Sequence, residues 1–261
     1  MGVSELLQVS GRLATEFPWL IVSKYFDKVD STQERIVQWI PKMEDDGAIL
    51  VMAESQTKGL GRQGRTWISP PGGVWFTLAF PMKSLDVVQA APFSLVSALQ
   101  VVNALKEVNN LECVIKWPND IIIDGKKLGG ILLSTITKFK RNWLLIGVGI
   151  NVNNDVPAGL EKTATSIKQV RGQTQGRSRL IEAILHNIWT AWQDFDKTGF
   201  GPYQKAVGER LTGVGKLAKV AMGKKSTQGT LMGIDPQGGL LLKSKSSTET
   251  VHAGEIVGTL S

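Results

Sequence analysis

We expect the 261-residue chain to adopt an α/β (α+β) fold, with a mixed β-sheet flanked by helices and a small all-β unit after it. Two observations support this prediction. Up to Tyr203, apolar runs of strand length alternate with segments whose apolar residues recur at helical spacing. From residue 214 onwards, short alternating runs are separated by glycine-containing turns, which is typical of all-β structure. The change of pattern predicts two domains, residues 1–208 and 209–261.

The first half of the chain is predicted to alternate strands and helices. The expected strands are residues 18–22, 48–53 and 74–80, and the expected helices are residues 31–43 and 92–105. Ser31 and Glu34 fit a capping box at the start of the first helix. Pro92 suits the first turn of the second helix, because that turn does not need its missing N–H group.

Further strands and one strong helix are expected in the second half. The strand-like runs are residues 112–117, 120–123, 127–133 and 143–150. Asp124 and Gly125 form the dipeptide that a two-residue hairpin turn favours, because both central positions need positive φ. Residues 153–178 are polar and are expected to be mostly loop, followed by an amphipathic helix from Leu180 to Trp192.

Composition restricts the class of protein. Hydrophobic residues make up 42% of the chain and charged residues 20%, which is enough apolar surface for a sizeable core. The single cysteine, Cys113, excludes an internal disulfide, and two histidines argue against a histidine-built metal site. No leader-like N-terminus and no run near the ~20 apolar residues of a membrane span is found. We therefore expect a cytoplasmic protein without membrane contacts.

Net charge of +7 fits an anionic partner, such as a nucleotide phosphate, an acidic protein or a nucleic acid. A glycine-rich loop supplies a more specific signal. Residues 59–64 read G-x-G-x-x-G, but the prolines at 70 and 71 prevent the helix that a dinucleotide-binding loop must open. Arg62 and Arg65 lie three apart in this loop, where they either hold an anion or are simply solvated.

A second cluster combines cations with a carboxylate. The sequence KWPND at residues 116–120 ends a predicted strand, and the following hairpin brings Lys127 back beside it. Two lysines near an anion suit phosphoryl or acyl chemistry, in which developing charge needs fixed cations. The alternative is structural, with Asn119 and Asp120 in a turn and the lysines facing solvent.

These segments together resemble the biotin protein ligases. The matching pieces, in family order, are DST at 30–32, Gln56 with the G-x-G-R-x-G-R-x-W loop at 59–67, KWPND at 116–120, KLGGIL at 127–132 and GVGIN at 147–151. The resemblance covers roughly residues 25–260 and implies a class II synthetase-like catalytic domain with a C-terminal Src-homology-like β-barrel. It implies ATP-dependent formation of biotinyl-5′-adenylate, and then transfer of biotin to a lysine of the biotin carboxyl carrier protein of acetyl-CoA carboxylase.

The resemblance also assigns site residues. Those implied to bind biotin are Ser31, Thr32, Gln33, Gln56, Gly59, Leu60, Gly61, Arg62, Lys127 and Gly130. Those implied to bind ATP are Arg62, Arg65, Trp67, Asn119, Lys127 and Asn151, and the implied catalytic residues are Arg62, Lys116, Asp120 and Lys127. Asp120 is expected to receive the ammonium group of the carrier lysine. No protein metal site is expected, since Mg²⁺ would be held through the ATP phosphates.

Structural alternatives are open for two individual residues. Ser31 has a purely structural interpretation as the cap of a helix, and Trp67 has one as core packing. Two departures from the family pattern also stand out: Leu60 occupies a position where many relatives carry arginine, and Ser134 one where an acidic residue is usual.

The rival functions are a lipoate ligase or octanoyl transferase of the same fold, and a nucleic-acid-binding regulator. Some relatives carry an additional N-terminal DNA-binding domain of about sixty residues. Only about thirty residues precede Ser31, so we expect no DNA contact and no repressor function. The oligomeric state is left open by the sequence.

Overall fold

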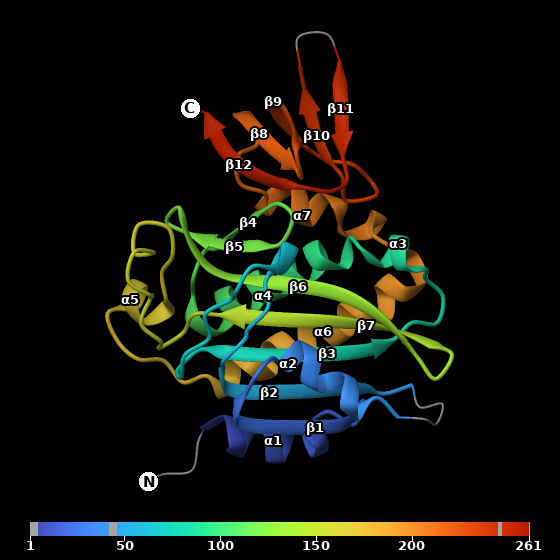
Figure 1. Ribbon diagram of the computed structural model, residues 1–261, viewed down its shortest axis with the longest axis vertical. Helices are drawn as coiled ribbons and strands as arrows, with labels where there is room; N and C mark the ends of the chain where they lie inside the picture. The colour runs from blue at the N-terminus through green and yellow to red at the C-terminus, as the bar shows by residue number, and fades with distance from the viewer. Residues whose placement is uncertain (1–4, 42–45, 245–246, 261) are drawn as a thin grey trace.

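The computed structural model describes residues 5–41, 46–244 and 247–260 and places them in two β-sheets with helices packed on the larger one (Figure 1). The strands of the larger sheet are β1 (Leu20–Val29), β2 (Ala48–Gln56), β3 (Val74–Pro81), β4 (Val114–Lys116), β5 (Asp120–Ile123), β6 (Lys126–Lys138) and β7 (Arg141–Ile150). Those of the smaller sheet are β8 (Leu217–Met222), β9 (Lys225–Ile234), β10 (Leu240–Lys243), β11 (Thr248–Val251) and β12 (Glu255–Leu260). The smaller sheet lies beside β4 and β5, at one edge of the larger sheet.

Strand order in the larger sheet is β1-β2-β3-β7-β6-β5-β4, and only the β1–β2 pair is parallel. A parallel pair needs a crossover connection, and here the crossover contains the short helices α2 (Thr32–Arg35) and η1 (Ile36–Trp39). The remaining neighbours along the sheet are antiparallel. The predicted mixed sheet is therefore confirmed.

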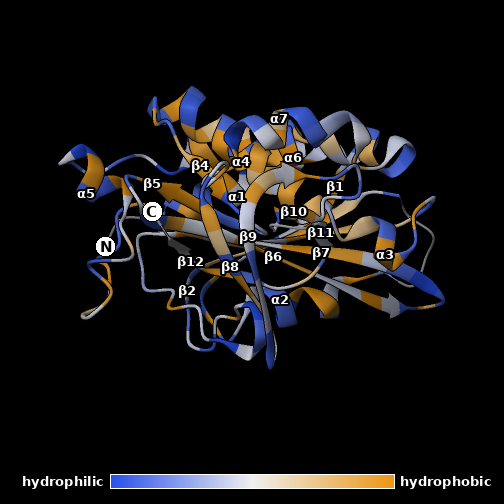
Figure 2. Cartoon of the chain, turned by 90° about the horizontal axis from the view of Figure 1, so that it is seen from above, coloured by the Kyte–Doolittle hydropathy of each residue, from blue (hydrophilic) through white to orange (hydrophobic). Residues whose placement is uncertain are grey.

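The remaining helices are α1 (Glu5–Glu16), η2 (Arg62–Gly64), α3 (Val87–Ala90), α4 (Phe93–Asn109), α5 (Ile167–Arg171), α6 (Ser178–Thr198), η3 (Gly201–Tyr203) and α7 (Gln204–Arg210). Figure 2 shows α4 and α6 on one face of the large sheet and α2 on the other. The main core lies between the sheet and α4 and α6. A smaller apolar cluster that includes Ile36, Val51 and Trp143 packs beneath η1.

One segment, Val87–Asn109, is long and apolar enough by composition to cross a membrane. In the folded protein, its α4 part lies against α6 and β6. The apolar residues Leu95, Val102 and Leu105 are buried there. The composition of this segment therefore matches its place in the protein core.

Most predicted elements are present, with longer strands than expected. β6 extends to Lys138 and β2 to Gln56, beyond the predicted ends at 133 and 53. Asp124 and Gly125 form the predicted hairpin turn, with φ of 49° and 74°. The five strands of the smaller sheet confirm the predicted all-β unit.

The prediction of a continuous helix over residues 31–43 is wrong. α2 ends after one turn, a 3₁₀ turn follows, and Ile40 has extended geometry (φ −64°, ψ 119°). Pro41 accounts for this end, because proline disfavours helical geometry in the residue before it. The final residues of the predicted helix, 42 and 43, lie outside the described residues.

The predicted capping box at Ser31 and Glu34 is also wrong. Ser31 precedes α2 with extended geometry, but its hydroxyl makes no capping hydrogen bond. The Thr32 N–H group at the start of the helix donates instead to Gln56 Oε1, at 2.8 Å. Ser31 Oγ is thereby available for another purpose.

Among the described residues, four α-helices were not expected from the sequence: α1, α3, α5 and α7. α1 precedes the first strand, and α5 interrupts the polar segment at 153–178. Ser166 and Gln169 form a capping box at the start of α5, a signal that is present in the sequence. In addition, Glu5 at the start of α1 accepts hydrogen bonds from the N–H groups of Arg177 and Ser178, which open α6.

Candidate active site

A cavity of about 890 Å³ lies between α2, the strands β5–β7, the glycine-rich loop and the smaller sheet. Its lining contains almost every residue that the sequence implicated, and of those only Gly59 is not part of it. The implicated residues in the lining are Ser31, Thr32, Gln33, Gln56, Leu60, Gly61, Arg62, Arg65, Trp67, Lys116, Asn119, Asp120, Lys127, Gly130 and Asn151. Residues from distant parts of the chain thus share one site.

The glycine-rich loop forms a hairpin-like flap, defined here as residues 56–69. Gln56 is bridged to Ser69, and Leu60 to Thr66, while a single 3₁₀ turn forms the tip. A side chain on Gly59 would place its Cβ 2.3 Å from the Trp67 carbonyl oxygen, so only glycine fits there. Because the flap does not open a long helix, it lacks the dinucleotide-binding geometry, as the sequence predicted.

One end of the cavity is lined by buried polar groups. Gln56 Oε1 accepts from both the N–H and the hydroxyl of Thr32, and Gln56 Nε2 donates to Ser69 Oγ at 2.8 Å. Thr77 Oγ1 lies 2.9 Å from Thr32 Oγ1 and 3.1 Å from Gln33 Oε1. This end of the cavity can therefore form hydrogen bonds with a polar ligand.

Ser31, at the same polar end of the cavity, differs from these residues in its hydrogen bonding. The residue is fully buried, and its Oγ has no hydrogen-bond partner among the described residues. An unpaired hydroxyl in the protein interior costs free energy, of the order of 1–3 kcal/mol. A ligand with a hydrogen-bonding head would supply the missing partner.

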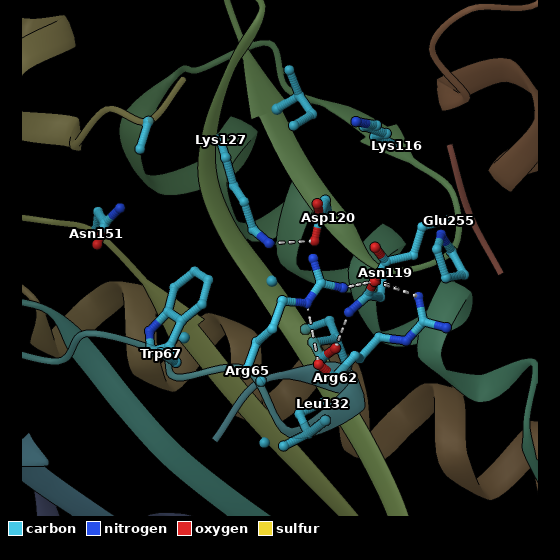
Figure 3. A pocket seen from close by; sticks show the side chains of 18 of the residues that line it. Arg62, Arg65, Trp67, Lys116, Asn119, Asp120, Lys127, Leu132, Asn151 and Glu255 are labelled. Carbon is cyan, nitrogen blue, oxygen red and sulfur yellow. Dashed lines mark hydrogen bonds and ion pairs between the residues drawn. The ribbon is translucent and has the colours of Figure 1, made fainter. Parts of the chain in front are cut away.

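The opposite side of the cavity carries the cations (Figure 3). Lys127 Nζ lies 2.6 Å from Asp120 Oδ1 and 5.1 Å from the centroid of the Trp67 ring. Arg62 donates to Asn119 Oδ1 at 3.4 Å and to the Gly254 carbonyl at 3.3 Å. Burial lowers the pKa of Arg62; the charge of Arg65 lowers it further, and Asp120 opposes the change.

Glu255 is a site residue that the sequence did not reveal. It begins β12 in the smaller sheet, forms an ion pair with Arg65, and lies 4.0 Å from Arg62 Nη1. No motif or periodicity marks it, because its role depends on how the two sheets are placed. Figure 3 shows its carboxylate directed at the two arginines of the flap.

The other implicated residues contribute in different ways. Lys116, at the end of β4, lines the cavity and has no carboxylate partner among the described ion pairs. Asn151 also lines it, but its side chain donates to Thr165 O and accepts from Asn154, so its amide is largely engaged in holding a loop. Trp67 packs against Gly149, where a Cβ would approach its Nε1 to 2.8 Å.

Ser134, whose presence the sequence left unexplained, has a defined contact. Its Oγ accepts a hydrogen bond of 2.8 Å from Gln33 Nε2. The backbone of Lys127 also fixes the position of residues 163–165. Its N–H donates to the Thr163 carbonyl, and its carbonyl accepts from the Thr165 N–H.

Among the described residues, no group of three or more His, Cys, Asp or Glu side chains is arranged to hold a metal ion. The carboxylates nearest the cations, Asp120 and Glu255, are already paired with Lys127 and Arg65. The donor set of the cavity is thus suited to an anionic ligand.

Comparison with known proteins agrees with this site. The model of the biotin/lipoate A/B protein ligase family matches residues 25–151, and that of the biotin protein ligase C-terminal domain matches residues 217–257. The first match contains the flap and the KWPND segment, and the second contains Glu255. Fold and site thus define a ligase of the biotin and lipoate class.

Individual relatives narrow the class. The bifunctional ligase/repressor BirA of Bacillus subtilis is 32% identical over 237 residues, covering 89% of this chain and 72% of the relative. The biotin–[acetyl-CoA-carboxylase] ligase of Paracoccus denitrificans is 31% identical over 241 residues, covering 88% of this chain and 97% of the relative. A biotin protein ligase from Aquifex aeolicus, solved with biotin and ATP, superposes with a TM-score of 0.78 at 30% identity, covering 88% of this chain and 95% of that one. The chain belongs to the biotin protein ligase family.

Proposed function

We propose that the protein is an ATP-dependent ligase that activates biotin as biotinyl-5′-adenylate and transfers it to a lysine of a biotin carboxyl carrier protein. The observation that carries this proposal is the fully buried hydroxyl of Ser31 at the polar end of the cavity, which has no hydrogen-bond partner in the described part of the chain. Biotin's ureido ring offers both hydrogen-bond donors and an acceptor. The dithiolane ring of lipoate offers neither, and buried polar groups left unpaired by a ligand discriminate strongly against it.

In the first step, a carboxylate oxygen of biotin attacks the α-phosphorus of ATP. The bond to the β-phosphate oxygen breaks, and pyrophosphate leaves. Arg62 and Lys127 are the cations proposed to stabilise the charge on the reacting phosphate and carboxylate, with Lys116 in support. Arg65 is proposed to hold the β- and γ-phosphates, and Trp67 and Asn119 to shape the nucleotide pocket.

In the second step, the amine of the carrier lysine attacks the acyl carbon of the adenylate and AMP leaves. The lysine must lose a proton before it can attack. Asp120 lies in the cavity beside Lys127; we propose that its carboxylate receives the ammonium group and takes up the proton that the lysine loses.

Magnesium is proposed to enter with ATP and to neutralise phosphate charge. Since both carboxylates near the cations have protein partners, its ligands would be mainly phosphate oxygens and water. The remaining partners that we propose are a carrier domain of acetyl-CoA carboxylase and the small molecules biotin and ATP; DNA and membranes are not among them. We place the protein in the cytoplasm and its domain boundary near residue 208.

The decisive experiment is exchange of label between pyrophosphate and ATP. The purified protein is expected to catalyse this exchange only when biotin is present, because exchange requires reversible formation of the adenylate. Lipoate, used at the same concentration, should give at most a few per cent of the rate. Exchange that depends on lipoate, or that is absent with biotin, would overturn the proposal.

A further inference from the structure

Beside the predicted biotin-binding groups, a chain of hydrogen bonds continues to a residue outside the cavity. It runs from Thr32 through Thr77 to the amide of Gln33, and it ends at the hydroxyl of Ser134 on β6. Ser134 is not part of the cavity lining, whereas Gln33 is. Any effect of Ser134 on a ligand is therefore exerted through Gln33.

The Gln33 amide is held at both ends. Its oxygen lies 3.1 Å from Thr77 Oγ1, and its nitrogen donates to Ser134 Oγ at 2.8 Å. The side chain is nearly buried, with 8% of its surface exposed. Its oxygen also lies against β7. A Cβ on Gly147 would approach Gln33 Oε1 to 2.6 Å, so β7 has no room for a side chain at this position.

These contacts restrict the orientation of the Gln33 amide and decide which of its hydrogens can reach a ligand. A carboxamide nitrogen carries two hydrogens, and Ser134 takes one of them. No protein acceptor for the second one is found among the described residues. Because Gln33 lines the cavity beside Thr32, that hydrogen is available to an acceptor atom of a bound ligand.

We propose that Ser134 is a positioning residue for biotin recognition, fixing the orientation of the Gln33 amide so that it selects a ligand head with an acceptor at this position. The inference rests on the proposed biotin ligase function. Without the Ser134 hydroxyl, the Gln33 amide nitrogen loses its hydrogen-bond acceptor. The amide group can then turn over, so that its oxygen and nitrogen exchange positions. The pocket then discriminates less between an acceptor and a donor in the ligand head.

Ser134→Thr and Ser134→Val form a matched pair, because threonine and valine have nearly the same shape and differ by the hydroxyl. Ser134→Val is expected to raise the KM for biotin about tenfold, since it leaves a buried N–H group without its acceptor. The KM for ATP and kcat should change less than twofold. Ser134→Thr should restore the KM for biotin to within about twofold of the wild type.

A second measurement separates recognition from general loosening of the fold. In 2-iminobiotin, a cyclic guanidine replaces the urea, so donors stand where biotin has its carbonyl acceptor. The ratio of kcat/KM for biotin to kcat/KM for 2-iminobiotin should fall at least fivefold in Ser134→Val and stay unchanged in Ser134→Thr. Loss of packing alone would reduce both values equally and leave the ratio as it was.

Thr137→Val serves as the control on the same strand, because the Thr137 hydroxyl bonds Asn142 at 2.7 Å and does not face the cavity. It should leave the biotin KM and the ratio unaltered. If Ser134→Val matches Ser134→Thr in both measurements while the wild type is active, the inference is wrong. If the wild type shows no biotin-dependent exchange, the proposed function itself has failed.

Discussion

Each cation that we assign most directly to the phosphates has a carboxylate partner within the protein. Lys127 is paired with Asp120, and Arg65 is paired with Glu255, which also lies near Arg62. Fixed partners keep long flexible side chains in place, which lowers the entropy lost when a ligand is bound. Glu255 also offsets the repulsion between Arg62 and Arg65, because its carboxylate contacts both. The cations are thus oriented in advance of binding.

Lys127→Ala is expected to reduce biotin-dependent pyrophosphate exchange by about a hundredfold or more, since it removes a cation from the reacting phosphate. The fold should persist, because Lys127 holds residues 163–165 through its backbone. Lys126→Ala is the control, as Lys126 precedes Lys127 in β6 and does not line the cavity. Near-normal exchange by Lys127→Ala would show that its proposed role is wrong.

Cys113 gives a prediction about reactivity. Burial, together with the charges of Asp124 and Glu112, raises the pKa of this thiol to about 12. Thiol reagents need the thiolate, so the native protein should resist labelling at pH 8. The same chain in concentrated urea should be labelled within minutes. Rapid labelling of the native protein, followed by absorbance, would contradict the buried position of this residue.

At the scale of elements, the flap shows what a motif can and cannot reveal. The spacing of Arg62 and Arg65 in a glycine loop pointed to an anion site, and the structure places both in the cavity. The hairpin form of the flap depends on two bridges, between Gln56 and Ser69 and between Leu60 and Thr66. Such pairings are set by the surrounding fold, so the loop sequence alone did not predict them.

The predicted end and the predicted cap of the helix over residues 31–43 were both wrong, for different reasons. Pro41 is a signal within the sequence: it disfavours helical geometry at Ile40, and this local effect outweighs the apolar periodicity that predicts a longer helix. The capping role expected of Ser31 failed for a different reason. A residue 24 positions away, Gln56, accepts the N–H of Thr32, and local sequence rules do not include such partners.

The carboxylate of Glu5 in α1 accepts hydrogen bonds from the start of α6, and its ionisation therefore affects the stability of the fold. Burial opposes ionisation of Glu5, but hydrogen bonds from Ser178 and Arg177 outweigh it and lower its pKa. A lowered pKa means that the stabilisation is present above the ordinary value near 4.5 and is lost as the pH falls below it.

Glu5→Gln should therefore lower the free energy of unfolding by about 1 kcal/mol at pH 7. This is less than the contribution of a fully buried hydrogen bond to a charged group, because the Glu5 side chain is partly exposed. Urea denaturation of both proteins at pH 7 and at pH 4 or below checks this. The difference between them should shrink at the lower pH. An equal difference at both values would contradict the role of the charge.

At the scale of the molecule, the smaller sheet contributes to the site as well as adjoining it. Its strand β12 supplies Glu255, and Trp117 Nε1 of the larger unit donates to Gly238 O at 3.1 Å. The sequence predicted both units from their patterns, yet not the contact between them. Residues such as Glu255 become functional only through that contact, which local patterns do not encode.

Glu255→Ala is expected to loosen the flap without altering the core. Amide hydrogen exchange at Gly61 and Trp67, whose N–H groups close the flap, should accelerate several-fold in the absence of substrates. Exchange in α4 should be unchanged. Glu249→Ala is the matched control, because Glu249 lies in the same sheet and contacts Thr227. Equal flap exchange in both variants would show that Glu255 does not hold the flap.

The cavity also has a consequence for biosynthesis. Its lining includes Ser31 and Glu255, which are separated by most of the larger sheet in the sequence. Contacts between such distant residues form late in folding, since a long segment must first be closed into a loop. A nascent chain on the ribosome can thus build the large sheet and the Lys127–Asp120 pair, but Arg62 and Arg65 of the flap lack their counter-ion Glu255 until β12 has emerged and paired with β8. The two arginines of the flap therefore gain their carboxylate partner only after β12 has been synthesised.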